Sequence, residues 1–551
     1  MKIKLVSSLE KCFLDEDIDA KEEFASGSSL KEELFRFGIC YVAKERCATA
    51  RPVLLTLKSD ISQHIAIREV QHVPVKLPVY NTAENVDYLR TAPGLYPDLL
   101  TPINAHHRLL VSNNLESLLV EVDTTKIEKA GVYPIEFVFS DFQNKTVIAS
   151  LVFHLEIIDC VLPKQKLIYT QWFYCDCLMD YYGTKAFDQK HWQIIENYVK
   201  TAAKNGINMI LTPVFTPPLD TFVGGERSTT QLVDISLRKG SYHFRFDKLG
   251  KWIDLCRWAG IEYFEISHFF TQWGAAHAPK IMATVDGKEK RIFGWETEAC
   301  GPEYTAFLRL FIPKLLTYLR KRKIDRNCYF HISDEPNLSQ LPSYTAAKNV
   351  VAPLLEGYPI IDALSNYEFY ANGTVQHPIP ATTHIKPFLE HHVPDLWTYY
   401  CCCQHDGVSN RFLSMPSYRN RILGVQLYKY GIKGFLHWGY NFFNSQYSYH
   451  AINPFVSTDG NYFAPSGDAF SVYPARDGTA FESLRLIVFH DALQDMRALE
   501  KCESLYNRSY VEKLIEETGG VNLTFREYPR NQHFLLDLRK KINQSIKSAL
   551  S

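Results

Sequence analysis

The chain of 551 residues is too long for one ordinary hydrophobic core, so we expect two or three domains. It is 46% hydrophobic and 22% charged, which excludes a disordered chain. With 60 Lys and Arg against 61 Asp and Glu, the net charge of −1 argues against a nucleic-acid partner. No apolar run is long enough to span a bilayer, so we expect no membrane association.

Residues 1–160 carry short runs in which apolar and polar side chains alternate, as they do in half-buried β-strands. In "GVYPIEFVFS" the apolar face is formed by Ile135, Phe137 and Phe139, and "TVIASLVFHLEI" alternates in the same way after the turn residues "DFQNK". Several such strands with polar turns predict an N-terminal β-sandwich. The segment "VLPKQK" that follows is typical of a linker.

From residue 167 onward, strand patterns alternate with helix patterns. The expected strands are "LIYTQWF", "INMILTP", "IEYFEIS", "NCYFHIS", "PIIDALS", "LWTYYCC" and "IKGFLHW". Helices such as "FDQKHWQIIENYVKTAAKNG" and "FDKLGKWIDLCRWAG", the second capped at Asp247, lie between them, and a long polar loop follows "INMILTP". This alternation predicts a parallel sheet, most simply a (β/α)8 barrel over residues 167–500. An open doubly wound sheet is the alternative, but no Gly-rich loop follows the first strand. Residues 501–551 predict a helical extension packed outside the barrel.

Polar and aromatic side chains gather where the predicted strands end, and a barrel builds its active site at that end. The residues concerned are Gln171, Trp172, His268, Gln272, Trp273, Asp334, Glu335, Trp397, Tyr399, Tyr400, Trp438, Tyr440 and Asn441. Taken singly, His268, Trp397 or Trp438 is better explained as a structural group of the core. Together they provide the aromatic faces and hydrogen-bonding groups that a pyranose needs.

The cysteines do not predict a metal site. Cys175 and Cys177 flank Asp176, and the run from Cys401 to Cys403 is contiguous, so neither has the C-x2-C pairing of structural zinc. No phosphate-binding loop and no G-x-S-x-G elbow is present, and we expect no cofactor. Thirteen cysteines, an odd number, together with an N-terminus too charged for a secretion signal, predict reduced thiols and a cytoplasmic location.

Two adjacent carboxylates, Asp334 and Glu335, stand in "YFHISDEPN" where an apolar strand meets solvent. Their repulsion raises the tendency of one of them to stay protonated, which suits a general acid. Pro336 restricts Glu335 to an extended or turn conformation, so a local bend is able to bring both carboxyls to one cavity.

The motif "HISDEPN", preceded by "EISHFFTQWGA" and "FGWE" and followed by "GFLHWGYNFF" and "GDAFSVYP", resembles glycoside hydrolase family 123. It also resembles the wider group called domain of unknown function 4091. The resemblance spans about Leu167 to Leu499, and the β-rich N-terminal segment fits the layout of the family. Characterised members are retaining, substrate-assisted β-N-acetylgalactosaminidases. The resemblance therefore implies a reaction in which the 2-acetamido oxygen of the sugar attacks the anomeric carbon and forms an oxazolinium intermediate.

The resemblance also implies roles for individual residues. Glu335 is the expected acid/base, and Asp334 is expected to orient and charge-balance the acetamido N–H. A tyrosine, either Tyr399 or Tyr400, is expected to hold the acetamido carbonyl. The expected sugar-binding residues are Trp438 as the floor, His268 and Asn441 for the hydroxyls, and Trp273 at the rim.

Two other functions remain open at this point. One is a conventional retaining glycosidase, in which Asp334 or Glu335 pairs with a distant carboxylate such as Glu265 or Asp220. The other is a non-catalytic glycan-binding barrel, since fold alone does not establish turnover. In each case the expected partner is a carbohydrate. The sequence leaves the amino sugar, N-acetylgalactosamine or N-acetylglucosamine, its linkage and the oligomeric state undecided.

Overall fold

The N-terminal part consists of two five-stranded sheets that face each other. The computed structural model describes residues 1–80, 87–103 and 107–550. The first sheet has the order β1 (Lys2–Ser7), β3 (Leu34–Val42), β8 (Glu116–Asp123), β5 (Ile65–Val75) and β6 (Gly94–Pro102). The second has the order β2 (Ser26–Lys31), β10 (Val147–Val161), β9 (Gly131–Asp141), β4 (Arg51–Lys58) and β7 (Arg108–Val111). Phe37 of the first sheet stacks on Phe153 of the second with ring centroids 3.9 Å apart, so the sheets share one core.

The central part contains a parallel sheet of six strands. Its order is β18 (Cys328–Phe330), β15 (Tyr263–Ile266), β12 (Met209–Thr212), β11 (Ile168–Gln171), β22 (Gly434–His437) and β21 (Trp397–Tyr399). Two further strands, β19 (Ile361–Leu364) and β20 (His377–Pro380), form a separate parallel pair. Single bridges link this pair to the two edges of the sheet, from Phe330 to Ile360 and from Ala381 to Tyr399. The continuous ladder is therefore a half-barrel of six strands rather than one sheet of eight.

A helix follows each of these eight strands, and β11 is followed by two, α1 and α2. The helices are α1 (Cys175–Tyr182), α2 (Gln189–Lys204), α3 (Asp247–Ala259), α4 (Pro302–Lys321), α5 (Leu341–Val351), α6 (Glu368–Ala371), α7 (Lys386–Glu390), α8 (Tyr418–Lys429) and α9 (Leu484–Leu505). The Asp188 side chain caps α2 by accepting from the backbone N–H of His191. Asp247, expected as the cap of α3, is instead its first residue, and that helix ends at Gly260 in the left-handed region (φ 104°).

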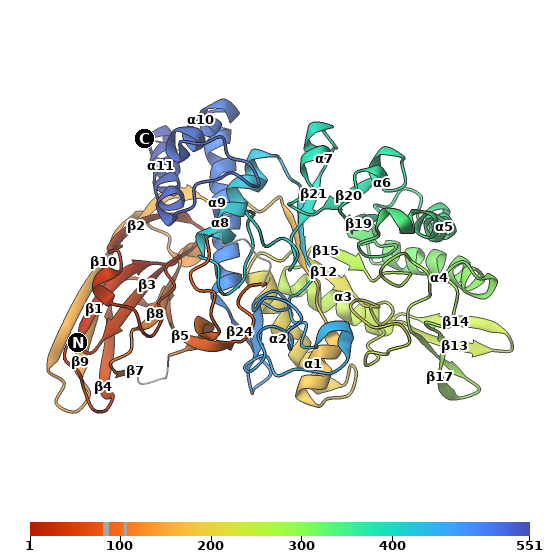
Figure 1. The fold of residues 1–551 in the computed structure, drawn as a ribbon, viewed down its shortest axis with the longest axis horizontal. Coiled ribbons are helices and arrows are strands. Elements are labelled where there is room, and N and C mark those ends of the chain that lie inside the picture. The colour runs from red at the N-terminus through yellow and green to blue at the C-terminus, as the bar shows by residue number, and fades with distance from the viewer. Residues whose placement is uncertain (81–86, 104–106, 551) are drawn as a thin grey trace.

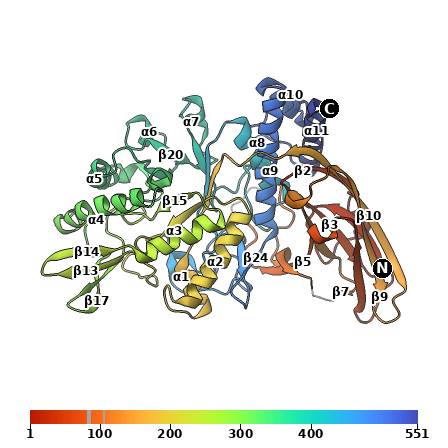
Figure 2. The same cartoon turned by 180° about the vertical axis from the view of Figure 1, so that it is seen from behind.

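The expected long polar loop after β12 contains strands, which corrects the sequence prediction. They are β13 (Asp234–Arg238) and β14 (Ser241–Arg245), which join β16 (Ile281–Val285) and β17 (Lys288–Phe293) from the segment after β15 in one four-stranded sheet. Tyr242 and Phe244 of β14 pack on Phe307 of α4, with ring centroids 5.2 and 5.8 Å away. This sheet projects from the end of the molecule opposite the N-terminal sheets (Figures 1 and 2).

The C-terminal helices connect the two halves of the molecule. Helix α9 crosses the expected domain boundary at residue 500. A short antiparallel pair, β23 (Val472–Pro474) and β24 (Ala480–Glu482), precedes α9, and the helices α10 (Arg508–Gly519) and α11 (Gln532–Leu550) follow it. Arg539 of α11 forms ion pairs with Glu33 at 2.5 Å and with Asp495 of α9 at 2.9 Å. Helix α11 therefore lies between the N-terminal sheets and α9 (Figure 1). No helix in the described ranges has the length and apolar character needed to cross a membrane.

Candidate active site

Asp334 and Glu335 lie in a bend shortly after β18, which ends at Phe330, at the carboxyl edge of the parallel sheet. Glu335 has φ 43°, a left-handed conformation that is rare for a residue with a side chain. The bend is held on both sides, because Glu335 N–H donates to Ala363 O at 3.2 Å and Trp273 N–H donates to Asp334 O at 3.1 Å. Trp273 is also left-handed, with φ 58°. Such strained backbone persists where the surrounding structure enforces it, and it concentrates at functional sites.

The two candidate tyrosines point in opposite directions. Tyr399 Oη donates to Glu335 Oε1 at 2.5 Å, whereas Tyr400 Oη donates to Asn420 Oδ1 at 3.0 Å. Adjacent residues at the end of a strand face opposite sides, which explains the difference. The structure thus brings Tyr399 to the carboxylate pair and turns Tyr400 toward α8.

Both carboxyls hold their protons more strongly than free carboxyls do. Burial raises the pKa of Asp334 well above its usual range, and the neighbouring charge of Glu335 raises it further. Burial also raises the pKa of Glu335, although the hydrogen bond from Tyr399 opposes this effect. Glu335 reaches solvent and Asp334 is half-buried, although the protein around both carboxyls removes much of their hydration. An adjacent pair with raised pKa values retains a proton to higher pH than an isolated carboxyl, which general acid catalysis requires.

A fully buried charged network lies beside the pair, around His331. His331 Nε2 is 2.6 Å from Glu265 Oε1, and its Nδ1 is 3.0 Å from Asp362 Oδ1. Burial alone would lower the pKa of His331, but hydrogen bonds to Asp362 and Glu265 raise it to about 10. The imidazolium therefore balances two carboxylates near Asp334, and its charge lowers the pKa of Asp334.

The two distant carboxylates considered as partners in a conventional mechanism differ in availability. Glu265 is fully buried and accepts from Trp172 Nε1 at 2.7 Å and Thr170 Oγ1 at 2.8 Å in addition to His331. Glu265 is therefore not available to a substrate. Asp220, after β12, is partly buried and accepts from the backbone N–H of Tyr447 at 2.9 Å; burial raises its pKa to about 7.

His268 lies in the interior beside His331. The two rings stack with centroids 4.2 Å apart, and neither ring nitrogen of His268 has a hydrogen-bond partner among the described residues. Burial lowers the pKa of His268 well below its usual range, so the ring is neutral. A ligand atom of His268, one of His331 and one of Asp362 lie within 4.8 Å of one another. Both His331 nitrogens already face carboxylates, so this group suits a proton-bearing network better than a metal ion.

Of the other expected sugar-binding residues, the two tryptophans remain accessible to a ligand, whereas the asparagine does not. Trp438 is half-buried and donates from Nε1 to Asp468 Oδ2 at 2.8 Å, which fixes its ring. Trp273 is 39% exposed, enough for a ring to stack on it. Asn441 is fully buried, and its side-chain amide bonds the backbone of Tyr174. Its Oδ1 accepts from Tyr174 N–H at 2.9 Å, and its Nδ2 donates to Tyr174 O at 3.0 Å. The expectation that Asn441 binds a hydroxyl does not fit this geometry.

The sequence analysis missed His331 and Asp362 as members of the site. Both stand within strand patterns that are otherwise apolar, "NCYFHIS" and "PIIDALS". A charged residue is rarely buried unless it is paired. Asp362 in the middle of "PIIDALS" was therefore the available signal that a buried cation faces that strand.

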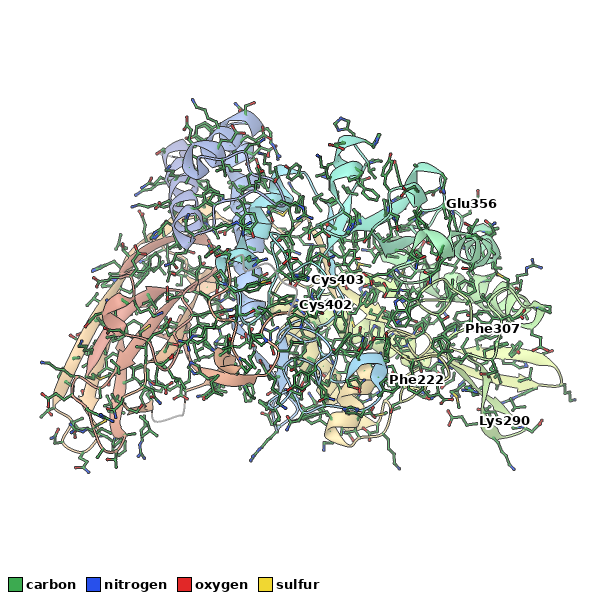
Figure 3. All side chains as sticks on the ribbon, viewed as in Figure 1. Phe222, Lys290, Phe307, Glu356, Cys402 and Cys403 are labelled. Carbon is green, nitrogen blue, oxygen red and sulfur yellow. The ribbon has the colours of Figure 1, made fainter. Side chains whose placement is uncertain are left out.

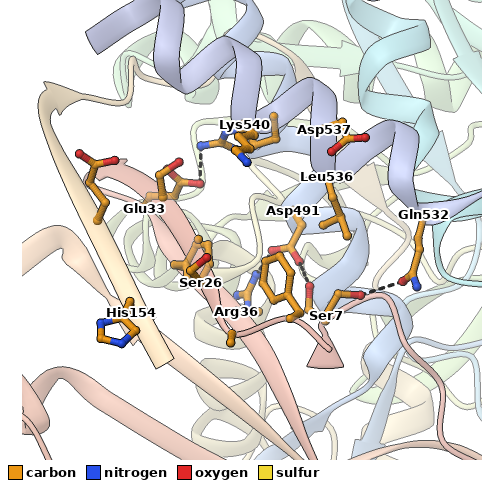
Figure 4. Close-up of a pocket in the computed structure, with 18 of the residues that line it drawn as sticks. Ser7, Ser26, Glu33, Arg36, His154, Asp491, Gln532, Leu536, Asp537 and Lys540 are labelled. Atoms are coloured by element: carbon orange, nitrogen blue, oxygen red, sulfur yellow. Dashed lines mark hydrogen bonds and ion pairs between the residues drawn. The ribbon is translucent and has the colours of Figure 1, made fainter. Parts of the chain in front are cut away.

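The structure also contains a hollow of about 560 Å³ between the N-terminal sheets and α11 (Figure 4). None of the strand-end residues described above lines it. Its walls are bonded to each other, since Ser7 Oγ donates to Gln532 Oε1 at 2.8 Å and Arg36 pairs with Asp491 at 2.5 Å (Figure 4). This hollow therefore lies at the interface between the N-terminal sheets and the C-terminal helices, apart from the carboxylate pair.

The carboxylate pair lies within a stretch that matches a known family. The model of the glycoside hydrolase 123 catalytic domain matches residues 172–502. The chain belongs to glycoside hydrolase family 123. It is therefore a glycoside hydrolase, and its substrates are carbohydrates.

One solved structure shares the fold of the whole chain. A family 123 glycoside hydrolase from Clostridium perfringens, solved in work on glycolipid glycan hydrolysis, superposes with a TM-score of 0.72 over 99% of this chain and 97% of its own, at 15% identity. The β-glucuronidase 2 of Bacteroides uniformis, bound covalently to cyclophellitol-6-carboxylate aziridine, matches 82% of this chain and 48% of its own at 12% identity, but its TM-score is only 0.28. No curated protein matches the chain.

Proposed function

We propose that this family 123 enzyme cleaves β-linked 2-acetamido sugars with retention, by substrate-assisted catalysis. The observation that carries the proposal is the adjacent pair Asp334 and Glu335, held in a strained bend with Tyr399 bonded to Glu335. Only one residue of such a pair is needed as acid/base, because the nucleophile belongs to the substrate. The second is then free to act on the acetamido group.

In the first step the acetamido oxygen attacks the anomeric carbon while Glu335 gives its proton to the leaving oxygen. The bond to the aglycone breaks and an oxazolinium ion forms. In the second step water attacks the anomeric carbon, Glu335 takes a proton from that water, and the acetamido group is restored. Asp334 accepts a hydrogen bond from the acetamido N–H and balances the positive charge of the intermediate.

Substrate binding also decides which carboxyl carries the proton. In the free protein the pKa values of Asp334 and Glu335 are both raised, so the pair retains a proton. A hydrogen bond from the acetamido N–H favours the charged form of Asp334. The proton of the pair then resides on Glu335, where the leaving group needs it. A sugar without the acetamido group supplies neither this bond nor the nucleophile.

The remaining assignments follow from position. Tyr399 is the tyrosine placed to exchange its bond with Glu335 for one to the acetamido carbonyl, and Trp438 and Trp273 offer faces for N-acetylgalactosamine or N-acetylglucosamine.

We infer that the single bridges at Ile360 and Ala381 close the eight strands into a distorted (β/α)8 barrel. In the described part of the chain, which includes all thirteen cysteines, none is in a disulfide; we propose a cytoplasmic enzyme, which titration of free thiols in the native protein tests.

The test is a matched pair of chromogenic β-glycosides that differ only in carrying an acetamido or a hydroxyl group at carbon 2. We expect turnover of the acetamido glycoside and at least a hundredfold lower kcat/KM for the hydroxyl glycoside. Comparable turnover of both would support a conventional mechanism, with Asp220 as the accessible second carboxylate.

A further inference from the structure

Three consecutive cysteines, Cys401, Cys402 and Cys403, form a cluster of thiols immediately after β21. Their sulfur atoms all lie within 4.8 Å of one another, and Cys402 Sγ is 4.0 Å from Cys403 Sγ. Cys401 is buried, Cys402 is half-buried and Cys403 is exposed, so the cluster is open to solvent on one side. Figure 3 shows Cys402 and Cys403 near the middle of the molecule.

The turn that gathers the three sulfurs is held by buried side chains. Cys401 N–H donates to Gln404 Oε1 at 2.9 Å. The fully buried Asn410 donates from Nδ2 to both Cys401 O and Gln404 O, each at 2.8 Å. Consecutive residues in an extended chain would point to opposite sides. This turn, fixed by Asn410, instead places all three thiols on the same side, as a ligand set requires.

The spacing fits a metal ion bound by three sulfurs. With metal–sulfur bonds of about 2.3 Å, three thiolates around a planar trigonal ion stand about 4.0 Å apart. Thiolates select soft ions such as Cu(I). Zinc in structural sites takes four ligands, and no fourth His, Cys, Asp or Glu joins this group among the described residues. The absence of a C-x2-C pair speaks against tetrahedral zinc, whereas three contiguous thiols are compatible with a three-coordinate ion.

We propose that Cys401, Cys402 and Cys403 bind one soft monovalent cation of the Cu(I) class and that its binding inhibits hydrolysis. Each thiol that ligates the ion releases its proton to solvent, and the oxidation state of the metal does not change. One cation among three thiolates leaves the cluster negatively charged. Cys401 lies two residues after Tyr399, whose hydroxyl donates to Glu335 Oε1 at 2.5 Å, and a negative charge on Cys403 raises the pKa of Glu335. Added negative charge there opposes release of the Glu335 proton to the leaving group, so the inhibitory effect rests on the proposed function, whereas binding does not.

Binding is tested by titrating the fully reduced protein against Cu(I) held as its bathocuproine disulfonate complex. We expect wild type to remove one equivalent of copper. The double variant Cys402→Ser/Cys403→Ser should bind at least tenfold more weakly, and Cys300→Ser, which removes an exposed thiol outside the cluster, should match wild type. X-ray absorption should place three sulfurs at about 2.3 Å from copper. No copper uptake, or equal uptake by the double variant with an unchanged circular dichroism spectrum, would overturn the site.

Inhibition is tested separately on the same proteins. We expect copper-loaded wild type to retain less than a tenth of its hydrolytic rate and to recover when excess chelator removes the ion. The double variant should keep its rate in the presence of copper. Stoichiometric copper binding without loss of the hydrolytic rate would overturn the proposal that copper inhibits the enzyme, but the thiol cluster would still be a copper-binding site. A copper-free protein with no activity on any β-glycoside would count against the proposed function, and the binding titration would still decide the site.

Discussion

Replacing Tyr399 by Phe should shift the pH dependence of catalysis upward. Tyr399 Oη donates to Glu335 Oε1 at 2.5 Å, and this bond favours the charged carboxylate. Hydrogen bonds to charged groups contribute about 1.5–3 kcal/mol, and one pKa unit corresponds to about 1.4 kcal/mol. Because Glu335 reaches solvent, the lower end of that range applies. Without the hydroxyl, the pKa of Glu335 should therefore rise by about one unit.

The assay is kcat/KM against pH for an N-acetyl-β-hexosaminide, since this ratio reports the free enzyme. An acid must be protonated to work, so the alkaline limb should move about one pH unit higher in Tyr399→Phe. Tyr400→Phe is the matched control, because its hydroxyl bonds Asn420 and not the carboxylate pair. An unchanged or lowered alkaline limb in Tyr399→Phe, or an equal shift in Tyr400→Phe, would refute the assignment of Glu335 as the acid.

Three further predictions concern the neighbouring groups. Glu335→Gln should slow substrates with poor leaving groups about 10²–10⁴-fold and activated aryl glycosides much less, while Asp334→Asn should slow both alike; a common leaving-group dependence would contradict the separate roles. His331 has a pKa raised from 6.5 to about 10, so its contribution to stability is complete below pH 6.5 and is lost as the pH rises through about 10. The melting temperature of wild type should fall over that interval more steeply than that of His331→Gln, and parallel curves would count against a charged His331. Asn441→Ala leaves the Tyr174 backbone unpaired and should cost about 1–3 kcal/mol of unfolding free energy by denaturant titration, with KM unchanged; a raised KM at unchanged stability would instead make Asn441 a sugar ligand.

The elements predicted best were those with a strong periodic pattern. The helix that ends before Gly260 and the strands around Phe137 and Phe153 follow directly from apolar spacing and from glycine at a helix end. The strand β20 was missed because its four residues "HPIP" contain two prolines, which disfavour strand pairing. It lies in the two-stranded pair, where few ladder bonds are needed.

The four-stranded sheet is made of one hairpin inserted after β12 and one inserted after β15, and the sequence signalled both hairpins at their turns. Asp286 and Gly287 form the two-residue turn between β16 and β17, both with positive φ, and Lys239 and Gly240 do the same between β13 and β14. An Asp-Gly pair between short strands is a strong hairpin signal. Tyr242 and Phe244 of β14 alternate with exposed residues, but the stretch is only five residues long, and β17 is mostly exposed and charged.

At the site, the sequence placed the carboxylate pair but not its surroundings. Adjacent Asp334 and Glu335 were visible as a motif, and Tyr399 was one of two candidates. The choice between Tyr399 and Tyr400 depended on strand register, which a three-residue strand does not reveal. The bonds of Asn441 to Tyr174 join residues 267 positions apart. Such contacts arise from closure of the fold and have no local pattern.

The central claim, that the acetamido oxygen is the nucleophile, is tested most directly by weakening that oxygen without changing the enzyme. Aryl β-glycosides carrying N-acetyl, N-fluoroacetyl, N-difluoroacetyl and N-trifluoroacetyl groups form a series in which each fluorine withdraws electrons from the amide. If the amide attacks the anomeric carbon, kcat/KM should fall steeply with every fluorine added. A rate that stays nearly constant across the series would show that a carboxylate of the enzyme, and not the substrate, performs the attack.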